Sequence, residues 1–316
     1  MYDLVALGEA LIDFTYYGQS DEGAALFEQN PGGAPANVAV MGAKLGLSVA
    51  FIGKIGVDLN GDFLAKTLRE QGVDTKGLLR SDHEATAVAF VKLTEAERQF
   101  SFIRNPGADT TLAEAEVDFE IVRNTKIFHF GSLSLTDEPA RTATVRAARA
   151  AKAEGALVSY DPNYRPTLWK DHGEANLRLR GAVQLADIIK ISLEEAEILT
   201  GESDVEAAAE ALLNQGVTCV LVTLGAEGAL AATAEGFVRK SAAPCVAVDT
   251  TGAGDVFLGS FLYRLAKSGK TLAEHSLKDL EGYLAFANAA AALCVEKRGA
   301  MPSMPDISTI YEKIGM

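Results

Sequence analysis

Short apolar runs alternate along the chain with longer runs that are rich in Ala, Leu and Glu. The apolar runs are "DLVALG", "SVAFIG", "KIFHFG", "ALVSYD", "DIIKIS" and "TCVLVTLG". They are apolar on consecutive positions, as strands covered on both faces are, whereas a strand with one solvated face is apolar at every second position. These runs therefore predict buried strands.

The longer runs have the apolar spacing of helices. They predict helices over residues 36–45, 61–71, 138–154, 174–185, 204–215, 252–268 and 280–296. Alternation of strands and helices is typical of an α/β fold in which helices sandwich a mostly parallel sheet. We find no internal repeat and no linker, so we expect residues 1–316 to form a single domain with this three-layer arrangement.

Two segments interrupt the alternation. Residues 14–30 are too many for a simple loop, and residues 87–105 have the pattern of two strands joined by a charged turn. Both segments adjoin glycine-rich entries to the predicted core. A surface hairpin without a role is one interpretation. We favour a small β-sheet lid, formed by about residues 12–31 and 86–106, that closes over a substrate.

Composition narrows the classes of protein. The 316 residues are 48% hydrophobic and 23% charged, which is ordinary for a globular chain with a substantial core. The net charge of −14 disfavours nucleic acid or an anionic membrane as a partner, because both need stripes of Lys and Arg. The sequence shows no signal peptide and no apolar segment of about 20 residues, and its three cysteines are scattered. Together these features indicate a cytoplasmic protein with reduced thiols.

Several residues that follow the predicted strands are glycine or polar. Ligands of open parallel sheets bind at the carboxyl ends of the strands, so we expect the functional site at this edge. The residues in question are Gly8, Glu9, Asp13, Gly131, Asp161, Asn163, Arg165, Gly225, Asp249 and Asp255.

The stretch "DTTGAGDVFLGSF" has a side-chain-poor loop directly before a predicted helix. Gly252, Ala253 and Gly254 can present successive backbone N–H groups at the helix N-terminus, which is an anion hole suited to phosphate. Asp255 follows in the first turn. It is either a simple capping acid or a base that accepts the proton of a hydroxyl attacking the held phosphorus. The bare loop ahead of it favours the base.

A second stretch, "NPGGAPANVAV", also places glycines before a predicted helix. A tight turn with Asn37 as an ordinary helix residue would explain it. We expect instead that this stretch faces the anion hole across one active site.

These two stretches and "VTLGAEGA" together resemble the ribokinase-like, or phosphofructokinase-B, family of carbohydrate kinases. The motifs occur in the family's order and spacing over nearly the whole chain. Within the family, "DPNYRPTLW" and "FHFGSLSL" look most like fructokinases. The resemblance implies a ribokinase-like fold and transfer of the γ-phosphate of ATP, with Mg²⁺, to the 6-hydroxyl of fructose.

The resemblance also implies roles for single residues on the sugar side. Asp255 matches the catalytic base, and Gly252, Ala253 and Gly254 match the anion hole. The substrate-binding positions would be Asp13, Gly32, Gly33, Asn37 and Arg165, joined by Arg104 if the substrate carries a carboxylate.

On the nucleotide side the resemblance implies that Thr223, Gly225, Gly228 and Asn288 line the ATP site. The family's magnesium-linked NxxE motif falls on residues 192–195, where Ser192 replaces asparagine and Glu195 is retained. A monovalent cation such as K⁺ would be held, mostly by backbone carbonyls, at Asp249, Thr251, Cys294, Lys297, Gly299 and Ser303.

Three alternative functions were considered, together with the oligomeric state. A kinase for 2-keto-3-deoxygluconate, or for another sugar of the family, fits "DPNYR" as well. A catalytically silent sugar-binding regulator is possible on the same fold, although an intact GAGD motif weighs against it. A nucleotide-binding oxidoreductase is disfavoured, because "GEALID" after the first strand lacks GxGxxG. Exposed lid strands invite pairing, so we expect a homodimer formed through the lid.

Overall fold

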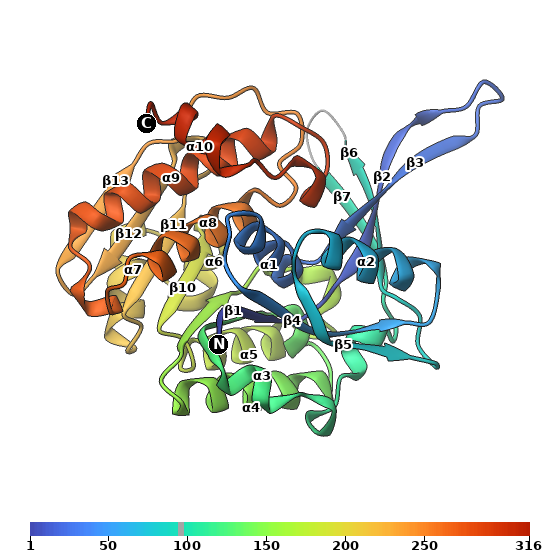
Figure 1. The fold of residues 1–316 in the computed structure, drawn as a ribbon, viewed down its shortest axis with the longest axis horizontal. Helices are drawn as coiled ribbons and strands as arrows, with labels where there is room; N and C mark the ends of the chain where they lie inside the picture. The colour runs from blue at the N-terminus through green and yellow to red at the C-terminus, as the bar shows by residue number, and fades with distance from the viewer. Residues whose placement is uncertain (94–97) are drawn as a thin grey trace.

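The computed structural model describes residues 1–93 and 98–316, and within them a nine-stranded sheet forms the centre of the molecule (Figure 1). Its order is β13-β12-β11-β10-β9-β8-β1-β4-β5. From β11 to β5 all neighbours are parallel, and β12 and β13 are antiparallel additions at one edge. The strands are β1 (Tyr2–Leu7), β4 (Val49–Gly56), β5 (Asp74–Ser81), β8 (Thr125–Gly131), β9 (Leu157–Asp161), β10 (Ile188–Ser192), β11 (Cys219–Thr223), β12 (Ala229–Thr233) and β13 (Gly236–Lys240).

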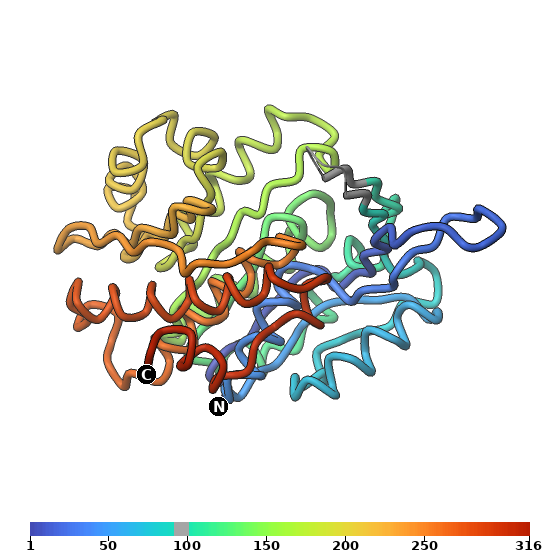
Figure 2. The backbone as a smooth tube through the Cα atoms, turned by 90° about the horizontal axis from the view of Figure 1, so that it is seen from above, coloured from blue at the N-terminus to red at the C-terminus, as the bar shows by residue number. Residues whose placement is uncertain are grey.

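Helices cover both faces of this sheet (Figures 1 and 2). Those packed on one face are α1 (Ala34–Lys44), α2 (Leu59–Glu70), α8 (Ala253–Lys267), α9 (Leu277–Val295) and α10 (Ile307–Lys313). Those packed on the other face are α3 (Phe119–Arg123), α4 (Ala140–Ala153), α5 (His172–Val183), α6 (Leu193–Thr200) and α7 (Val205–Asn214). The predicted α/β sandwich is therefore confirmed.

Strand β1 shows why the central runs are apolar at every position. Leu4 and Ala6 belong to the core shared with α1, α8 and α9, whereas Val5 and Leu7 belong to the core under α4 and α5. All four side chains are fully buried. Because successive side chains of a strand point to opposite faces, a strand between two helical layers has no solvated position.

Elements that lack such a pattern were not predicted. Strands β5 and β13 are the two edges of the sheet and are only partly buried, so their sequences carry polar residues. Helices α3, α6 and α10 are eight residues or shorter. Among the predicted helices, the shifts at the ends are small, such as Leu277–Val295 in place of 280–296.

A second, four-stranded sheet projects from the large one, in the order β3-β2-β6-β7 (Figure 1). Its strands are β2 (Leu11–Gln19), β3 (Ala25–Gly32), β6 (Val88–Leu93) and β7 (Arg98–Ile103). The expected small sheet built from two separate segments is thus confirmed, while the predicted charged turn falls on residues 94–97, outside the described residues. No described helix is both long and apolar enough to cross a membrane.

Asp58 joins helix α2 to the base of the small sheet. Its carboxylate caps α2 by accepting the N–H of Gly61 at 2.7 Å. It also accepts the N–H and the hydroxyl of Thr86, both at 2.8 Å, just before β6 begins. One side chain therefore fixes both a helix end and the entry to the projecting sheet.

Replacing Asp58→Ala should lower the free energy of unfolding by about 1–2 kcal/mol, because the cap and the bonds to Thr86 are lost together. Urea unfolding followed by circular dichroism measures this. As a control, Asp62→Ala on the same helix removes an exposed ion pair to Arg80 and should cost less than about 1 kcal/mol. Equal losses in the two variants would contradict the assignment.

Candidate active site

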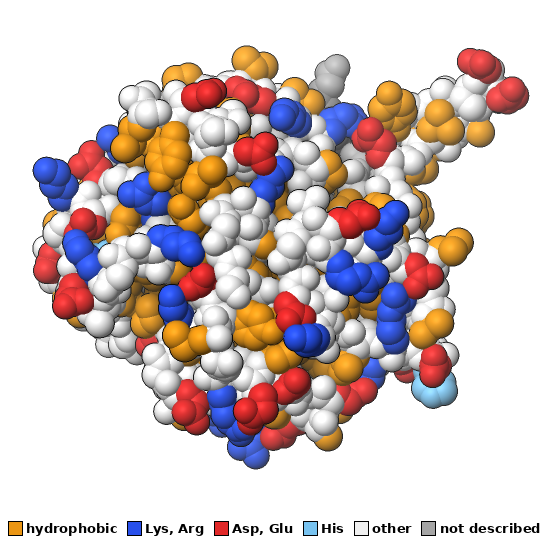
Figure 3. All heavy atoms as spheres, viewed as in Figure 1, with side chains coloured by type: hydrophobic (Ala, Val, Ile, Leu, Met, Phe, Trp, Pro, Cys, Tyr) orange, Lys and Arg blue, Asp and Glu red, His pale blue; other side chains and the backbone are white. Residues whose placement is uncertain are grey.

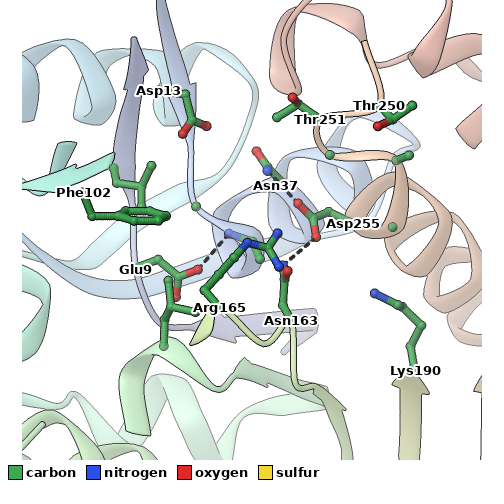
Figure 4. Close-up of a pocket in the computed structure, with 17 residues that line it drawn as sticks. Glu9, Asp13, Asn37, Phe102, Asn163, Arg165, Lys190, Thr250, Thr251 and Asp255 are labelled. Atoms are coloured by element: carbon green, nitrogen blue, oxygen red, sulfur yellow. Dashed lines mark hydrogen bonds between the residues drawn. The ribbon is translucent and has the colours of Figure 1, made fainter. Parts of the chain in front are cut away.

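A cavity of about 160 Å³ lies at the carboxyl edge of the parallel strands, between the N-termini of α1 and α8 (Figure 4). Both glycine-rich segments singled out in the sequence line it, one from each side. Its mostly polar walls suit a small polar molecule. Lining residues include Asp13, Gly33, Asn37, Phe102, Asn163, Arg165, Lys190 and residues 250–255.

Two glycines allow the chain to come close to the cavity at the start of α1. Gly33 has φ of 103°, and a Cβ there would collide with the carbonyl oxygen of Glu9. A Cβ on Gly32 would collide with Oδ2 of Asp13. Only residues without a side chain satisfy both positions. The glycine pair thus sets the entry of α1 and leaves the Asp13 carboxylate room beside the cavity.

Asp255 is buried in the first turn of α8 and is held by two side-chain amides. Nδ2 of Asn37 donates to its Oδ2 at 2.7 Å, and Nδ2 of Asn163 lies 3.4 Å from its Oδ1 (Figure 4). Burial, followed by the nearby charge of Asp161, raises the pKa of Asp255 to about 6, while Lys190 and the bond from Asn37 act in the opposite direction. Such a carboxylate is ionised at neutral pH and can still accept a proton.

The backbone of Asn163 is in the left-handed region, with φ of 41°. Among the described residues it is the non-glycine residue with positive φ, a conformation that costs energy in most side chains but less in asparagine. Its N–H bonds to Oδ1 of Asp161 at 3.1 Å, which stabilises the turn after β9. The result of this conformation is an amide aimed at Asp255.

Two more buried carboxyl groups line the cavity. Burial raises the pKa of Asp13 to about 7, opposed by the charge of Arg165. Burial likewise raises the pKa of Glu9 to about 7. Oε1 of Glu9 accepts the N–H of Ala34 at 2.9 Å, and its Oε2 has no hydrogen-bond partner in the part of the chain that the structure describes. Both groups can therefore change protonation near neutral pH.

The two arginines expected at the site differ in position. Arg165 lines the cavity and its guanidinium lies in front of Asp255 and Asn163 (Figure 4). Arg104 does not line this cavity. Its side chain is 2% exposed and forms an ion pair with Asp109 at 2.6 Å, with further bonds to Thr136 and the backbone of η3 (Leu133–Leu135). The expectation that Arg104 binds substrate is not supported, because its guanidinium is already engaged in the fold.

Lys190, which was not among the residues predicted for the site, forms a buried ion pair with Asp161. Nζ of Lys190 lies 2.7 Å from Oδ2 of Asp161, and the two side chains are 8% and 1% exposed. Lys190 also lines the cavity of Asp255. The signal in the sequence was a lysine within the apolar run "DIIKIS", because a charged side chain is rarely buried unless it is paired.

The predicted NxxE segment is the start of α6. Ser192 and Glu195 bond reciprocally, each side chain accepting the other's backbone N–H, at 3.3 and 2.9 Å. The second oxygen of Glu195 accepts the N–H of Tyr164 at 2.7 Å. Serine thus replaces asparagine without loss of the local cap. In the described residues no cluster of three or more His, Cys, Asp or Glu side chains is arranged to hold a metal.

The four residues expected to line a nucleotide are not among those that line this cavity. Thr223 ends β11, and Gly225 and Gly228 bound the turn that leads into β12. A Cβ on Gly228 would collide with the carbonyl of Lys240. Asn288, on α9, donates to that same carbonyl at 2.9 Å. The structure therefore brings two of the four, Gly228 and Asn288, to the carbonyl at the end of β13.

The six residues expected at a monovalent cation come together beside the N-terminus of α8. Asp249 accepts the N–H and hydroxyl of Thr251 at 2.9 and 2.6 Å, and the N–H of Gly299 at 3.0 Å. Sγ of Cys294 lies 2.9 Å from the hydroxyl of Ser303. The N–H of Lys297 bonds to the carbonyl of Cys294. Asp249 thereby orders the loop whose carbonyls would bind an ion.

Comparisons with known proteins agree with one another. A family model for pfkB family carbohydrate kinases matches residues 1–307. Fructokinase-2 of Oryza sativa subsp. japonica is 42% identical, over 98% of this chain and 93% of its own length. A fructokinase with bound ATP from Xylella fastidiosa has a TM-score of 0.92 at 35% identity, covering 100% of this chain and 99% of that one. A fructokinase from Vibrio cholerae O395, in a fructose, ADP and calcium ion bound form, has a TM-score of 0.90 at 33% identity, covering 99% and 98%.

Replacing Asn37→Leu should raise the pKa of Asp255 above its value of about 6, because the amide that stabilises the ionised carboxylate is removed. Carbon-13 NMR titration of the labelled carboxyl groups measures the shift. Asn163→Gly is the matched control, since it removes the longer contact and glycine tolerates the same φ. It should produce a smaller rise. An unchanged Asp255 titration in Asn37→Leu would disprove the assigned role.

Proposed function

The chain belongs to the pfkB family of carbohydrate kinases, and from that premise we propose that it transfers the γ-phosphate of ATP to the 6-hydroxyl of D-fructose. The relatives named fructokinase, at 42% identity over nearly the full chain, support fructose as the substrate. The observation that carries the proposal is the buried carboxylate of Asp255, which stands at the N-terminal amides of α8 and opens onto a small polar cavity.

The proposed transfer is a single displacement. The oxygen of the sugar hydroxyl forms a bond to the γ-phosphorus while the bond from that phosphorus to the β–γ bridging oxygen breaks, and ADP leaves with that electron pair. Asp255 takes the proton of the hydroxyl. The N–H groups of Gly252, Ala253 and Gly254 stabilise the charge that develops on the phosphoryl oxygens. Asn37 and Asn163 keep the Asp255 carboxylate in place.

We propose that the sugar binds at the wall of the cavity opposite the N-terminus of α8. We propose that Asp13 and Asn37 bond to hydroxyls of the sugar, that Gly32 and Gly33 let these hydroxyls approach the backbone, and that Arg165 binds at the phosphate side. The small sheet serves as a lid, formed by about residues 12–31 and 86–106, on one kinase domain of residues 1–316. Phe102, on β7, already lines the cavity, which supports this arrangement. A closed lid excludes water that would hydrolyse ATP.

We propose that Mg²⁺ accompanies ATP and offsets its phosphate charge. The carboxylate of Glu195 lines a second cavity of about 440 Å³ and accepts the backbone N–H groups of Ser192 and Tyr164. Such a group fits an ion that keeps several waters and takes its other ligands from phosphates, as Mg²⁺ does. Nucleotide contacts are proposed for Thr223, Gly225, Gly228 and Asn288.

A monovalent cation, K⁺, is proposed for the loop ordered by Asp249. Its ligands would be mostly backbone carbonyls of Thr251, Cys294, Lys297, Gly299 and Ser303. The cation would neutralise part of the charge beside the anion hole. We further propose a cytoplasmic enzyme, because free cysteines are typical of reducing compartments.

The alternative of a 2-keto-3-deoxygluconate kinase is less supported by the structure. A keto acid needs a cationic partner for its carboxylate, and two arginines were the candidates. Arg104 is paired with Asp109 away from the cavity, so Arg165 would have to bind the carboxylate as well as phosphate. Fructose requires no such second cation.

We propose that two copies assemble through their lids. Tyr17, Leu26, Phe27 and Ile103 are large apolar side chains of the small sheet that are 42–63% exposed. Apolar groups gather on the projecting hairpin of β2 and β3 (Figure 3). Strand β3 is an edge of its sheet, and an edge with apolar side chains favours pairing. A second copy would cover both features.

Asp255→Asn should lower kcat by about 10²–10⁴-fold, because the proton acceptor is lost while nucleotide binding is retained. The assay is ADP release with Mg²⁺ and K⁺ present, using fructose, 2-keto-3-deoxygluconate, ribose, glucose and no sugar. Fructose-dependent turnover that disappears in the variant is expected. Turnover with the keto acid alone would change the substrate, and near-normal turnover in Asp255→Asn would reject it as the base.

Leu26→Glu should convert a dimer into monomers, because it places a carboxylate on the face that the second copy covers. Light scattering at micromolar concentration measures the mass. Val57→Glu, at an apolar residue 62% exposed outside the lid, is the control and should leave the mass unchanged. A monomeric wild-type protein would overturn the proposed assembly.

A further inference from the structure

Lys190 occupies a position of β10 where the fold otherwise places an apolar core residue. Its neighbours Ile189 and Ile191 pack into the core under α5, α6 and α7. Lys190 therefore points to the opposite face, toward α8, where Ile188 joins the core. The residue is 6% exposed. A buried charge at this place costs stability, which calls for a role that an apolar side chain cannot fill.

The ammonium group of Lys190 lies against the proposed anion hole. A Cβ on Gly254 would lie 2.9 Å from Nζ. Figure 4 shows the side chain extending from β10 toward the N-terminus of α8, on the far side of Asn163 from Asp13. The absence of a side chain on Gly254 therefore leaves space in front of the ammonium.

Lys190 also stands where two cavities meet. It lines both the cavity of Asp255 and the neighbouring one of about 440 Å³ next to Glu195, together with Asn163 and Arg165. In the proposed reaction the first cavity receives the sugar, and the second is lined by Glu195, the carboxylate proposed to face the metal. A group that moves from nucleotide to sugar must pass this junction.

The electrostatics keep Lys190 charged and fixed. Burial alone would lower its pKa, but the charges of Asp161 and Glu195 outweigh burial and raise it above the ordinary value. One N–H of the ammonium is used by Asp161 at 2.7 Å. An ammonium has three donors, and Lys190 borders open space in both cavities, so donors remain for a phosphate oxygen.

We propose that Lys190 is a catalytic residue whose ammonium binds an oxygen of the γ-phosphoryl group during its transfer, with Asp161 holding it in place. The inference rests on the proposed sugar kinase activity. The bonds made and broken are those given above: the sugar oxygen joins phosphorus, ADP departs, and the proton goes to Asp255. Lys190 gains and loses no proton. It stabilises charge that the amides of α8 contact from the other side.

A purely structural role is the competing explanation, in which Lys190 only neutralises Asp161. Three variants separate the two: Lys190→Met, Asp161→Asn and the double variant. Lys190→Met leaves a buried carboxylate without its partner, so its stability should fall. The double variant removes both charges and should regain much of the fold, which circular dichroism and thermal unfolding measure.

The kinetic expectation distinguishes the explanations. If Lys190 binds the phosphoryl group, kcat with the preferred sugar falls by about 10²–10³-fold in Lys190→Met and stays low in the double variant. The KM for the sugar changes by less than about threefold, because the contact is made with phosphate. Recovery of wild-type kcat in the double variant would overturn the proposal and leave Lys190 as a counter-charge.

A binding measurement tests the contact between Lys190 and the γ-phosphoryl group independently of turnover. The non-hydrolysable analogue AMP-PNP carries the third phosphoryl group, and ADP lacks it. The affinity of the double variant for AMP-PNP should fall by about tenfold, with ADP affinity changed less than about twofold, as expected for one lost charge-assisted bond. Equal effects on both nucleotides would reject the contact. Wild-type protein that turns over no sugar would refute the proposed function, while this ratio would still test Lys190.

Discussion

The site depends on the meeting of two helix N-termini at one buried carboxylate. Asp255 begins α8, and Asn37, 218 positions earlier, reaches it from α1 with a 2.7 Å hydrogen bond. The two helices can lie this close because of Gly259, where a Cβ would come within 2.8 Å of the Cβ of Met41. Close packing on the sheet thus brings the N-terminal backbone of α8, the carboxylate proposed as proton acceptor and the loop proposed to bind the sugar to one small cavity.

This arrangement buries several carboxyl groups, and burying such groups costs stability. Burial raises the pKa of Glu9 and Asp13 to about 7 and that of Asp255 to about 6. For a carboxyl group whose folded pKa is raised, folding favours the protonated form. Its contribution to stability is therefore present at low pH and is lost as the pH rises through about 6 to 7. The cationic groups of Lys190 and Arg165 offset part of that cost, as expected where function opposes stability.

The small sheet borders the cavity but is separate from the large sheet. Strand β2 follows β1 almost directly, and β3 runs straight into the glycine pair before α1. The strands that form this sheet are therefore continuous with the segments that line the cavity, and Phe102 reaches the same cavity from β7. A movement of the small sheet would therefore displace Asp13 and Gly33, so the proposed sugar binding would be coupled to the position of the proposed lid.

The sequence by itself determined what local patterning can encode. Consecutive apolar residues specified strands buried on both faces, and the glycine-rich loop before α8 predicted an anion hole at Gly252–Gly254 with Asp255 directly behind it. Only the tertiary structure decided which charged groups meet there. Lys190 lies in an apolar run, and its proximity to Gly254 arises from the packing of β10 under α8. Arg104 does not line the cavity, because its guanidinium is paired with Asp109. Contacts between residues far apart in the sequence arise from tertiary packing, which the local sequence pattern does not encode.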